Sequence, residues 1–130
     1  MAGTLIGFGY ADLHDSADLR QLLGDAVDLV VDVRIKRWSG IRPFSTAVAD
    51  TVATAGYDYL WIPGLGNAGH RRSGPMRLVD PDAVGPVVSA LRDGQNVALM
   101  CACTDAKRCH RRFVIELARE AIPGLDVHER

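Results

Sequence analysis

Short apolar runs alternate with segments of helical periodicity along the whole 130-residue chain, and this alternation limits the folds that it can adopt. The runs are apolar on both faces, which is typical of parallel strands covered by helices on each side. The sequence therefore predicts an α/β fold, a single-domain three-layer sandwich with a mainly parallel sheet of four to five strands over residues 1–130. We expect strands at 4–10, 28–34, 57–63 and 96–103, a short fifth strand within 125–130, and helices at 16–26, 45–56, 80–94 and 109–121.

Capping residues indicate where these helices begin and end. Ser16 is placed to cap the first helix, and Ser45 or Thr46 the second, which Gly56 is expected to stop. Pro86 indicates a kink or a late start in the third helix.

The last predicted helix carries apolar residues on one stripe, formed by Phe113, Leu117 and Ala121. We expect this stripe to face the sheet, with His110 and Arg111 turned away from it.

Nothing in the sequence indicates export or a membrane. No apolar run approaches the roughly 20 residues of a membrane span, and the first ten residues lack the regions of a signal peptide. Three cysteines in such a chain predict reduced thiols rather than a disulfide framework. We therefore expect a cytoplasmic protein with no membrane partner.

Basic residues are concentrated in three windows that contain no acid. Eleven of the fifteen lysines and arginines lie in 34–42, 71–77 and 107–112, each after a predicted strand. Ligands of open parallel sheets bind beyond the carboxyl ends of the strands, so the windows are expected to meet there. Because clustered arginines suit phosphate or carboxylate groups, we expect a small anionic substrate, with a nucleotide as the leading class. The expected anion-binding residues are Arg34, Arg71, Arg108 and Arg111.

The segment ALMCACTDAKRCHRR, residues 98–112, supplies candidate catalytic groups. Cys101 ends a predicted strand before a helix N-terminus, where backbone amides and nearby cations stabilise a thiolate. This setting suits a nucleophile, whereas the alternative is a small buried hydrophobe. The spacing to the next arginines misses that of cysteine-dependent phosphatases and sulfurtransferases. His110 is the candidate general acid or base, or a phosphate ligand.

Three more residues are expected to support the site. Asp32 is predicted to orient Arg34 through an ion pair, with a general base as the alternative. Cys109 is expected to pack against the core. Trp38 lies among cations in a predicted loop and is the best candidate for stacking on a base.

A metal site and a redox pair are the competing interpretations of the cysteines. Cys101, Cys103, Cys109 and His110 match the count of a structural zinc site, but the paired spacings of zinc motifs are absent. The two-residue separation of redox cysteines is also missing. We therefore predict no metal and no cofactor.

Several motifs resemble those of domain-of-unknown-function family 488, small α/β proteins of bacteria and phages. They are a glycine-containing first strand (LIGFGY), Asp32-Val33-Arg34, Pro43-Phe44, Gly56-Tyr57, Leu65-Gly66, and Cys101 followed by Cys109-His110-Arg111. The match covers nearly the whole chain. The resemblance implies the α/β fold and the position of a pocket, and it implies no reaction.

The sequence leaves two classes of function open. One is an enzyme-like protein, a hydrolase or transferase, that acts on a nucleotide or nucleic-acid component through Cys101 and His110. The other is a non-catalytic nucleic-acid-binding or regulatory module. The net charge of −1 disfavours the broad basic face that duplex binding requires. A steep salt dependence of binding to random DNA would favour the module.

Overall fold

Residues 1–69, 75–105 and 108–130 are described by the computed structural model. Five strands form one parallel sheet in the order β3-β2-β4-β1-β5. The strands are β1 Leu5–Gly9, β2 Leu29–Asp32, β3 Asp58–Trp61, β4 Val97–Cys101 and β5 Val127–Glu129. The α-helices are α1 Ser16–Leu23, α2 Val48–Thr54, α3 Gly85–Arg92 and α4 Arg111–Ala121, and the short 3-10 helices named within the described residues are η1 Arg42–Phe44, η2 Pro63–Leu65 and η3 Pro81–Val84.

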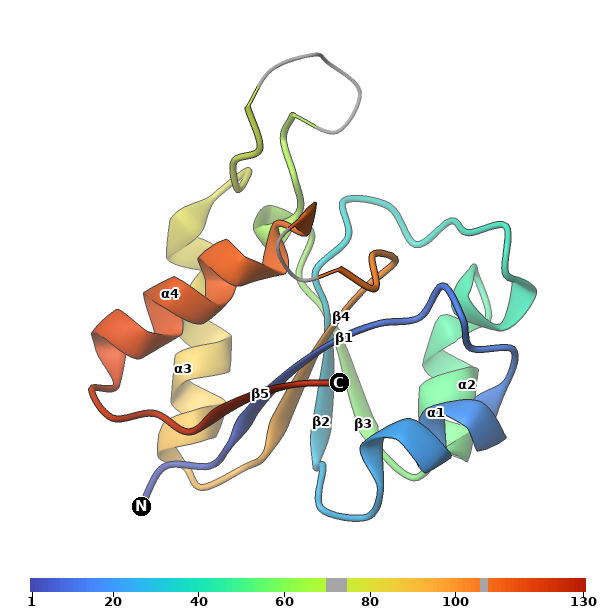
Figure 1. The fold of residues 1–130 in the computed structure, drawn as a ribbon, viewed down its shortest axis with the longest axis horizontal. Helices are drawn as coiled ribbons and strands as arrows, with labels where there is room; N and C mark the ends of the chain where they lie inside the picture. The colour runs from blue at the N-terminus through green and yellow to red at the C-terminus, as the bar shows by residue number, and fades with distance from the viewer. Residues whose placement is uncertain (70–74, 106–107) are drawn as a thin grey trace.

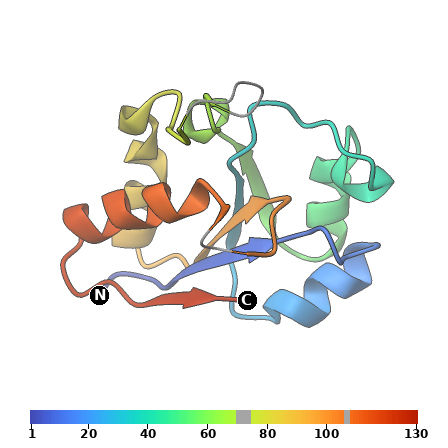
Figure 2. The same ribbon diagram turned by 45° about the horizontal axis from the view of Figure 1, so that its top comes forward.

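The helices cover both faces of the sheet, which confirms the predicted three-layer sandwich. Helices α3 and α4 lie on one face, and α1 and α2 lie on the other (Figures 1 and 2). The short tail strand β5 pairs with β1 at the edge of the sheet, as the sequence predicted.

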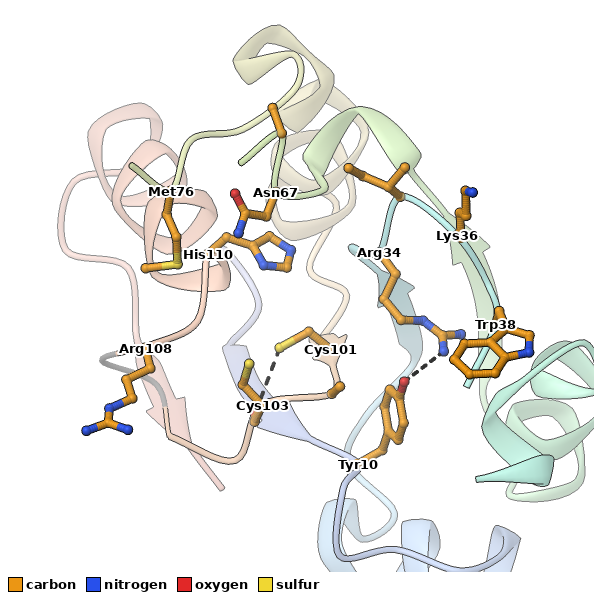
Figure 3. A pocket seen from close by; sticks show the side chains of 13 residues that line it. Tyr10, Arg34, Lys36, Trp38, Asn67, Met76, Cys101, Cys103, Arg108 and His110 are labelled. Carbon is orange, nitrogen blue, oxygen red and sulfur yellow. Dashed lines mark hydrogen bonds between the residues drawn. The ribbon is translucent and has the colours of Figure 1, made fainter. Parts of the chain in front are cut away.

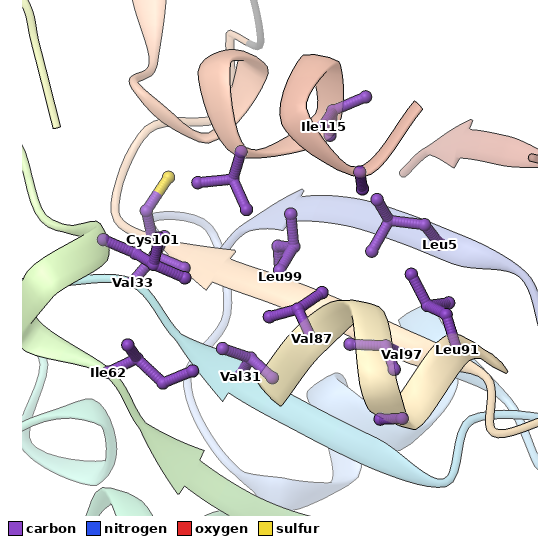
Figure 4. Packing of buried hydrophobic residues seen from close by; sticks show 14 of the residues in the cluster. Leu5, Val31, Val33, Ile62, Val87, Leu91, Val97, Leu99, Cys101 and Ile115 are labelled. Carbon is purple, nitrogen blue, oxygen red and sulfur yellow. The ribbon is translucent and has the colours of Figure 1, made fainter. Parts of the chain in front are cut away.

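Successive residues of each central strand point into opposite layers, because side chains alternate along a strand. Val31 and Leu99 pack beneath α3 and α4 (Figure 4), whereas Val30 and Ala98 belong to the cluster beneath α1 and α2. Both layers are lined by buried apolar side chains, and this explains why the central strands β1 and β4 contain no polar residue. Within the described residues, no helix combines the length and the apolarity that a membrane crossing requires.

The predicted N-caps of the first two helices are wrong, whereas Gly56 ends the second helix as expected, with a positive φ of 97° directly after the C-cap Ala55. Asp15 caps α1, since its Oδ1 accepts from the amide of Asp18 at 2.9 Å, while the Ser16 hydroxyl donates to the Thr51 carbonyl. Helix α2 begins after Ala47, without a side-chain cap, since Ser45 ends η1 and its hydroxyl oxygen accepts from the Ser39 amide instead. Pro86 marks a late start, as expected: η3 comes first, and α3 begins at Gly85.

The predicted buried stripe of α4 is also wrong. Val114, Ile115 and Ala118 face the sheet, together with Arg111 at the first turn, whereas Phe113 is only half-buried. Phe113 and Leu117 border the core and are only partly buried, whereas Val114 and Ala118, one position later in the chain, are fully buried on the face that also carries Arg111.

Candidate functional site

A pocket of about 750 Å³ opens beyond the carboxyl ends of β1, β2 and β4 (Figure 3). This is the position that the parallel sheet predicts for a ligand site, and the volume is typical of small-molecule sites. In the view of Figure 3, Tyr10, Arg34 and Trp38 form one side, and the cysteines and Arg108 lie across from them. The described lining residues are Tyr10, Arg34, Ile35, Lys36, Trp38, Asn67, Ala68, Met76, Cys101, Ala102, Cys103, Arg108 and His110.

The charged groups of the pocket are cationic. Arg34, Lys36 and Arg108 line it, and no acid is found among its described lining residues. Arg108 makes a 3.7 Å ion pair with Asp105, but both side chains are exposed and such pairs are weak. The expected residue Arg71 lies outside the described residues.

Arg34 is held in place by the ion pair that the sequence predicted. Its Nε and Nη2 donate to the two carboxylate oxygens of Asp32 at 2.8 and 2.7 Å. Its Nη1 donates to the Tyr10 hydroxyl at 3.0 Å and to the Phe44 carbonyl at 2.6 Å. Burial lowers the pKa of Arg34, but the hydrogen bonds and charge of Asp32 outweigh it and raise the pKa overall. Arg34 is therefore a permanent cation with a fixed orientation.

Asp32 has no exposed surface and is surrounded by donors. The Tyr59 hydroxyl donates to its Oδ2 at 2.6 Å, in addition to the two bonds from the Arg34 side chain and one from the Arg34 amide at 3.2 Å. Burial raises the pKa of Tyr59, and the hydrogen bond and charge of Asp32 raise it further, so the phenol stays neutral. This arrangement suits an orienting role for Asp32 rather than that of a general base.

Trp38 is 76 % exposed and lines the pocket. An indole on the rim offers a flat apolar face, which is the geometry expected of a stacking residue. The other tryptophan, Trp61, is used internally: its Nε1 donates to the Arg34 carbonyl at 2.7 Å, and the Arg37 guanidinium lies 4.5 Å from its ring.

The three cysteines lie close together, and two of them, Cys101 and Cys103, line the pocket. Strand β4 ends at Cys101, so Cys103 lies in the following loop and is exposed. The sulfurs of Cys101 and Cys109 are in contact, and the Cα atoms of this pair are 7.7 Å apart. The sequence predicted reduced thiols, whereas the structure brings the sulfurs of this pair into contact, because the end of β4 and the approach to α4 direct both side chains to one point.

His110 is buried, not turned away from the core as the sequence suggested. Its Nε2 lies 2.6 Å from the Val33 carbonyl oxygen. Since a carbonyl can only accept, Nε2 carries the hydrogen and Nδ1 is the acceptor nitrogen of the neutral ring. Nδ1 lies 3.8 Å from the Cys109 sulfur. The bond to β2 fixes the imidazole against the wall of the pocket.

Arg111 does not line the pocket, although the sequence placed it there. It is fully buried and makes a 3.0 Å ion pair with Glu129 of β5. Its Nη1 donates to the Cys101 sulfur at 2.9 Å and to the Cys103 carbonyl. Arg111 therefore supports Cys101 and Cys103 from behind, and the expected direct contact with a ligand is not available to it.

Two glycines of β1 allow this arrangement. A Cβ at Gly9 would lie 1.9 Å from the Cys103 carbonyl oxygen, so only glycine lets the loop after β4 approach the strand this closely. A Cβ at Gly7 would lie 2.1 Å from a Glu129 carboxylate oxygen. The glycines of the first strand thus make room for the loop of Cys103 and for the partner of Arg111.

We expect Gly9→Ala to lower the free energy of unfolding by about 1–3 kcal/mol, the usual effect of overpacking. The atoms in the way belong to the backbone of Cys103 and Thr104, which cannot rotate aside as a side chain can. Urea denaturation measures the loss. Gly40→Ala is the control, since no atom lies within 4 Å of a Cβ there. Equal unfolding energies for the two variants would contradict the close packing.

Sequence reasoning missed two residues of this region. Tyr10 directly follows β1, so the same rule of strand ends that selected Arg34 would have found it. Glu129 had no comparable indication, because its role depends on the pairing of β5 with β1.

Comparison with known proteins gives one result. The family described as Domain of unknown function DUF488 matches residues 16–118, from the start of α1 into the last turn of α4. Tyr10 and Glu129 lie outside this range. Searches of the curated proteins and of the solved structures found no match to the chain.

Proposed function

The chain belongs to the DUF488 family, whose description assigns no activity, and from the pocket itself we propose that the protein binds a small anionic ligand of the nucleotide class and acts on it through Cys101 and His110. The observation that carries the proposal is the combination of a buried cysteine with three cations in a pocket whose described lining contains no acid.

The three cations would contribute to anion binding in different ways. Arg34 already uses most of its donors within the protein, so it contributes a fixed positive charge more than new hydrogen bonds. Lys36 and Arg108 are exposed, so either side chain can turn toward a phosphate or carboxylate group, Arg108 by giving up its weak ion pair with Asp105. A charge-assisted bond from either is stronger than a neutral one. Trp38 would stack on the flat part of the ligand, which favours a nucleotide over a simple anion.

Cys101 supplies the chemistry. The guanidinium of Arg111, 2.9 Å from its sulfur, favours the thiolate form that acts as a nucleophile. The sulfur would form a bond to an electrophilic carbon or phosphorus of the ligand, while the leaving group departs with its electron pair. His110 lines the same pocket, and its acceptor nitrogen Nδ1 would take up the proton released by the Cys101 thiol and pass it to the leaving group.

Alkylation by iodoacetamide, followed peptide by peptide in a mass spectrometer, tests the proposal. In metal-free buffer with reductant, we expect Cys101 to react faster than the equally buried Cys109. A nucleotide at ten times its dissociation constant should slow labelling of Cys101 about tenfold, because occupancy protects the thiol. Lys36→Gln and Arg108→Gln should weaken this protection.

Arg119→Gln is the matched control, since Arg119 is an exposed cation of α4 that does not line the pocket. It should leave the protection unchanged. Equal, slow labelling of Cys101 and Cys109, with no effect of mono- or dinucleotides, would remove both the nucleophile and the ligand class. Protection by random single-stranded DNA alone, with a steep salt dependence, would favour the binding module instead.

A further inference from the structure

We propose that Cys101, Cys103 and Cys109 form a binding site for a soft metal ion, Zn²⁺ or Cu⁺, with one coordination position open to the pocket. The inference goes beyond the proposed function, since an anionic ligand can bind the pocket without a metal. Both involve the Cys101 sulfur, so the metal-bound and thiol-reactive proteins are two distinct states.

The convergence of three sulfurs is the first argument. The Sγ atoms of Cys101, Cys103 and Cys109 all lie within 4.8 Å of one another. Thiolates bound tetrahedrally to Zn²⁺, at about 2.3 Å each, are separated by about 3.8 Å. Small side-chain rotations therefore suffice to place one ion between them. The spacing of the cysteines in the sequence does not match a known zinc motif. The turn after β4 nevertheless brings the three sulfurs together.

The backbone spacing of Cys101 and Cys109 is the second argument. Cysteines joined by a disulfide have Cα atoms about 4.4–6.8 Å apart. The Cα atoms of this pair are 7.7 Å apart, although the sulfurs point at each other. This Cα separation is too long for an ordinary disulfide. It suits two cysteines that bind the same metal ion from opposite sides.

The charge of Arg111 and the solvent exposure of Cys103 also support a metal site. Three thiolates around Zn²⁺ leave one excess negative charge, and the Arg111 guanidinium beside the Cys101 sulfur offsets it. Soft sulfur ligands select Zn²⁺ or Cu⁺ over Mg²⁺ or Ca²⁺. Cys101 and Cys109 are buried, whereas Cys103 is exposed and gives an ion a way in. Three protein ligands and one open position are the pattern of reactive rather than structural zinc sites.

Metal titration of the full chain, reduced and freed of metal beforehand, tests the site. We expect one Zn²⁺ or one Cd²⁺ per chain by native mass spectrometry, and a sulfur-to-cadmium charge-transfer band in the ultraviolet. Cys103→Ser should weaken binding at least about tenfold, because it removes a direct ligand. Cys103 is exposed, so this variant should fold; circular dichroism verifies that it does.

Thr104→Ser is the matched control: it changes the exposed residue that follows Cys103, which is not among the pocket's lining residues, without touching a thiol, and should bind metal like the parent. Failure of the reduced protein to bind Zn²⁺, Cd²⁺ or Cu⁺ would overturn the proposal. So would unchanged affinity in Cys103→Ser, or a mass lower by two hydrogens that shows a Cys101–Cys109 disulfide under the same reducing conditions. Nucleotide protection of Cys101 is measured with a chelator present, so the metal site and the proposed function can fail independently.

Discussion

Asp32→Asn should lower the free energy of unfolding by about 3–5 kcal/mol, the usual effect of removing one partner of a buried ion pair. The amide keeps the size of the carboxylate but not its charge. Arg34, which is 8 % exposed, would then remain buried and charged, with an amide nitrogen facing one of its own donors. Tyr59 would lose its carboxylate acceptor as well. Urea denaturation followed by circular dichroism measures the change.

Asp58→Asn is the control for this variant. Asp58 lies on the neighbouring strand β3 but is exposed, so its loss of charge should change stability by less than about 0.5 kcal/mol. If both variants unfold at the same urea concentration, Asp32 does not hold Arg34 in the way its geometry indicates. Asp32→Asn should also disturb the pocket, because Arg34 lines it and would lose its fixed orientation.

Arg111→Met should lower the free energy of unfolding by about 2–3 kcal/mol. Methionine fills a similar volume, but it leaves Glu129 without its partner and the Cys103 carbonyl without its donor. The loss is smaller than for Asp32→Asn because Glu129 is partly open to water, which solvates the abandoned carboxylate. Thermal melts and urea denaturation both report it.

Arg111→Lys separates a structural from a ligand-binding arginine. Lysine keeps the charge but cannot reach Glu129, the Cys101 sulfur and the Cys103 carbonyl together. We expect a lower melting temperature with the ligand-induced shift retained. Arg119→Lys, on the exposed side of α4, should melt like the parent. A parent-like melt in Arg111→Lys with loss of the ligand shift would show that Arg111 contacts the ligand after all.

The sheet was predictable because its signal is local and repeated. Segments such as 28–34 have an apolar centre and end in charge, and one rule about strand ends then places Arg34, Cys101 and His110 at one edge. Arg111 was misplaced because sequence patterns treat arginine as a surface residue. Its burial depends on Glu129, which is distant in sequence and reaches it only after β5 pairs with β1. The contact of the cysteine sulfurs depends on a turn that spacing alone does not describe.

The packing of Gly7 against Glu129 restricts which substitutions this sequence can accept during evolution. Glu129 occupies the space that a side chain at position 7 would need, and Arg111 depends on Glu129 for its charge partner. A change at any one of the three positions therefore alters what is tolerated at the other two. Across homologues, an acid at the position of Glu129 should co-vary with glycine at that of Gly7 and arginine at that of Arg111, and descendants that lose one should lose the others in few evolutionary steps.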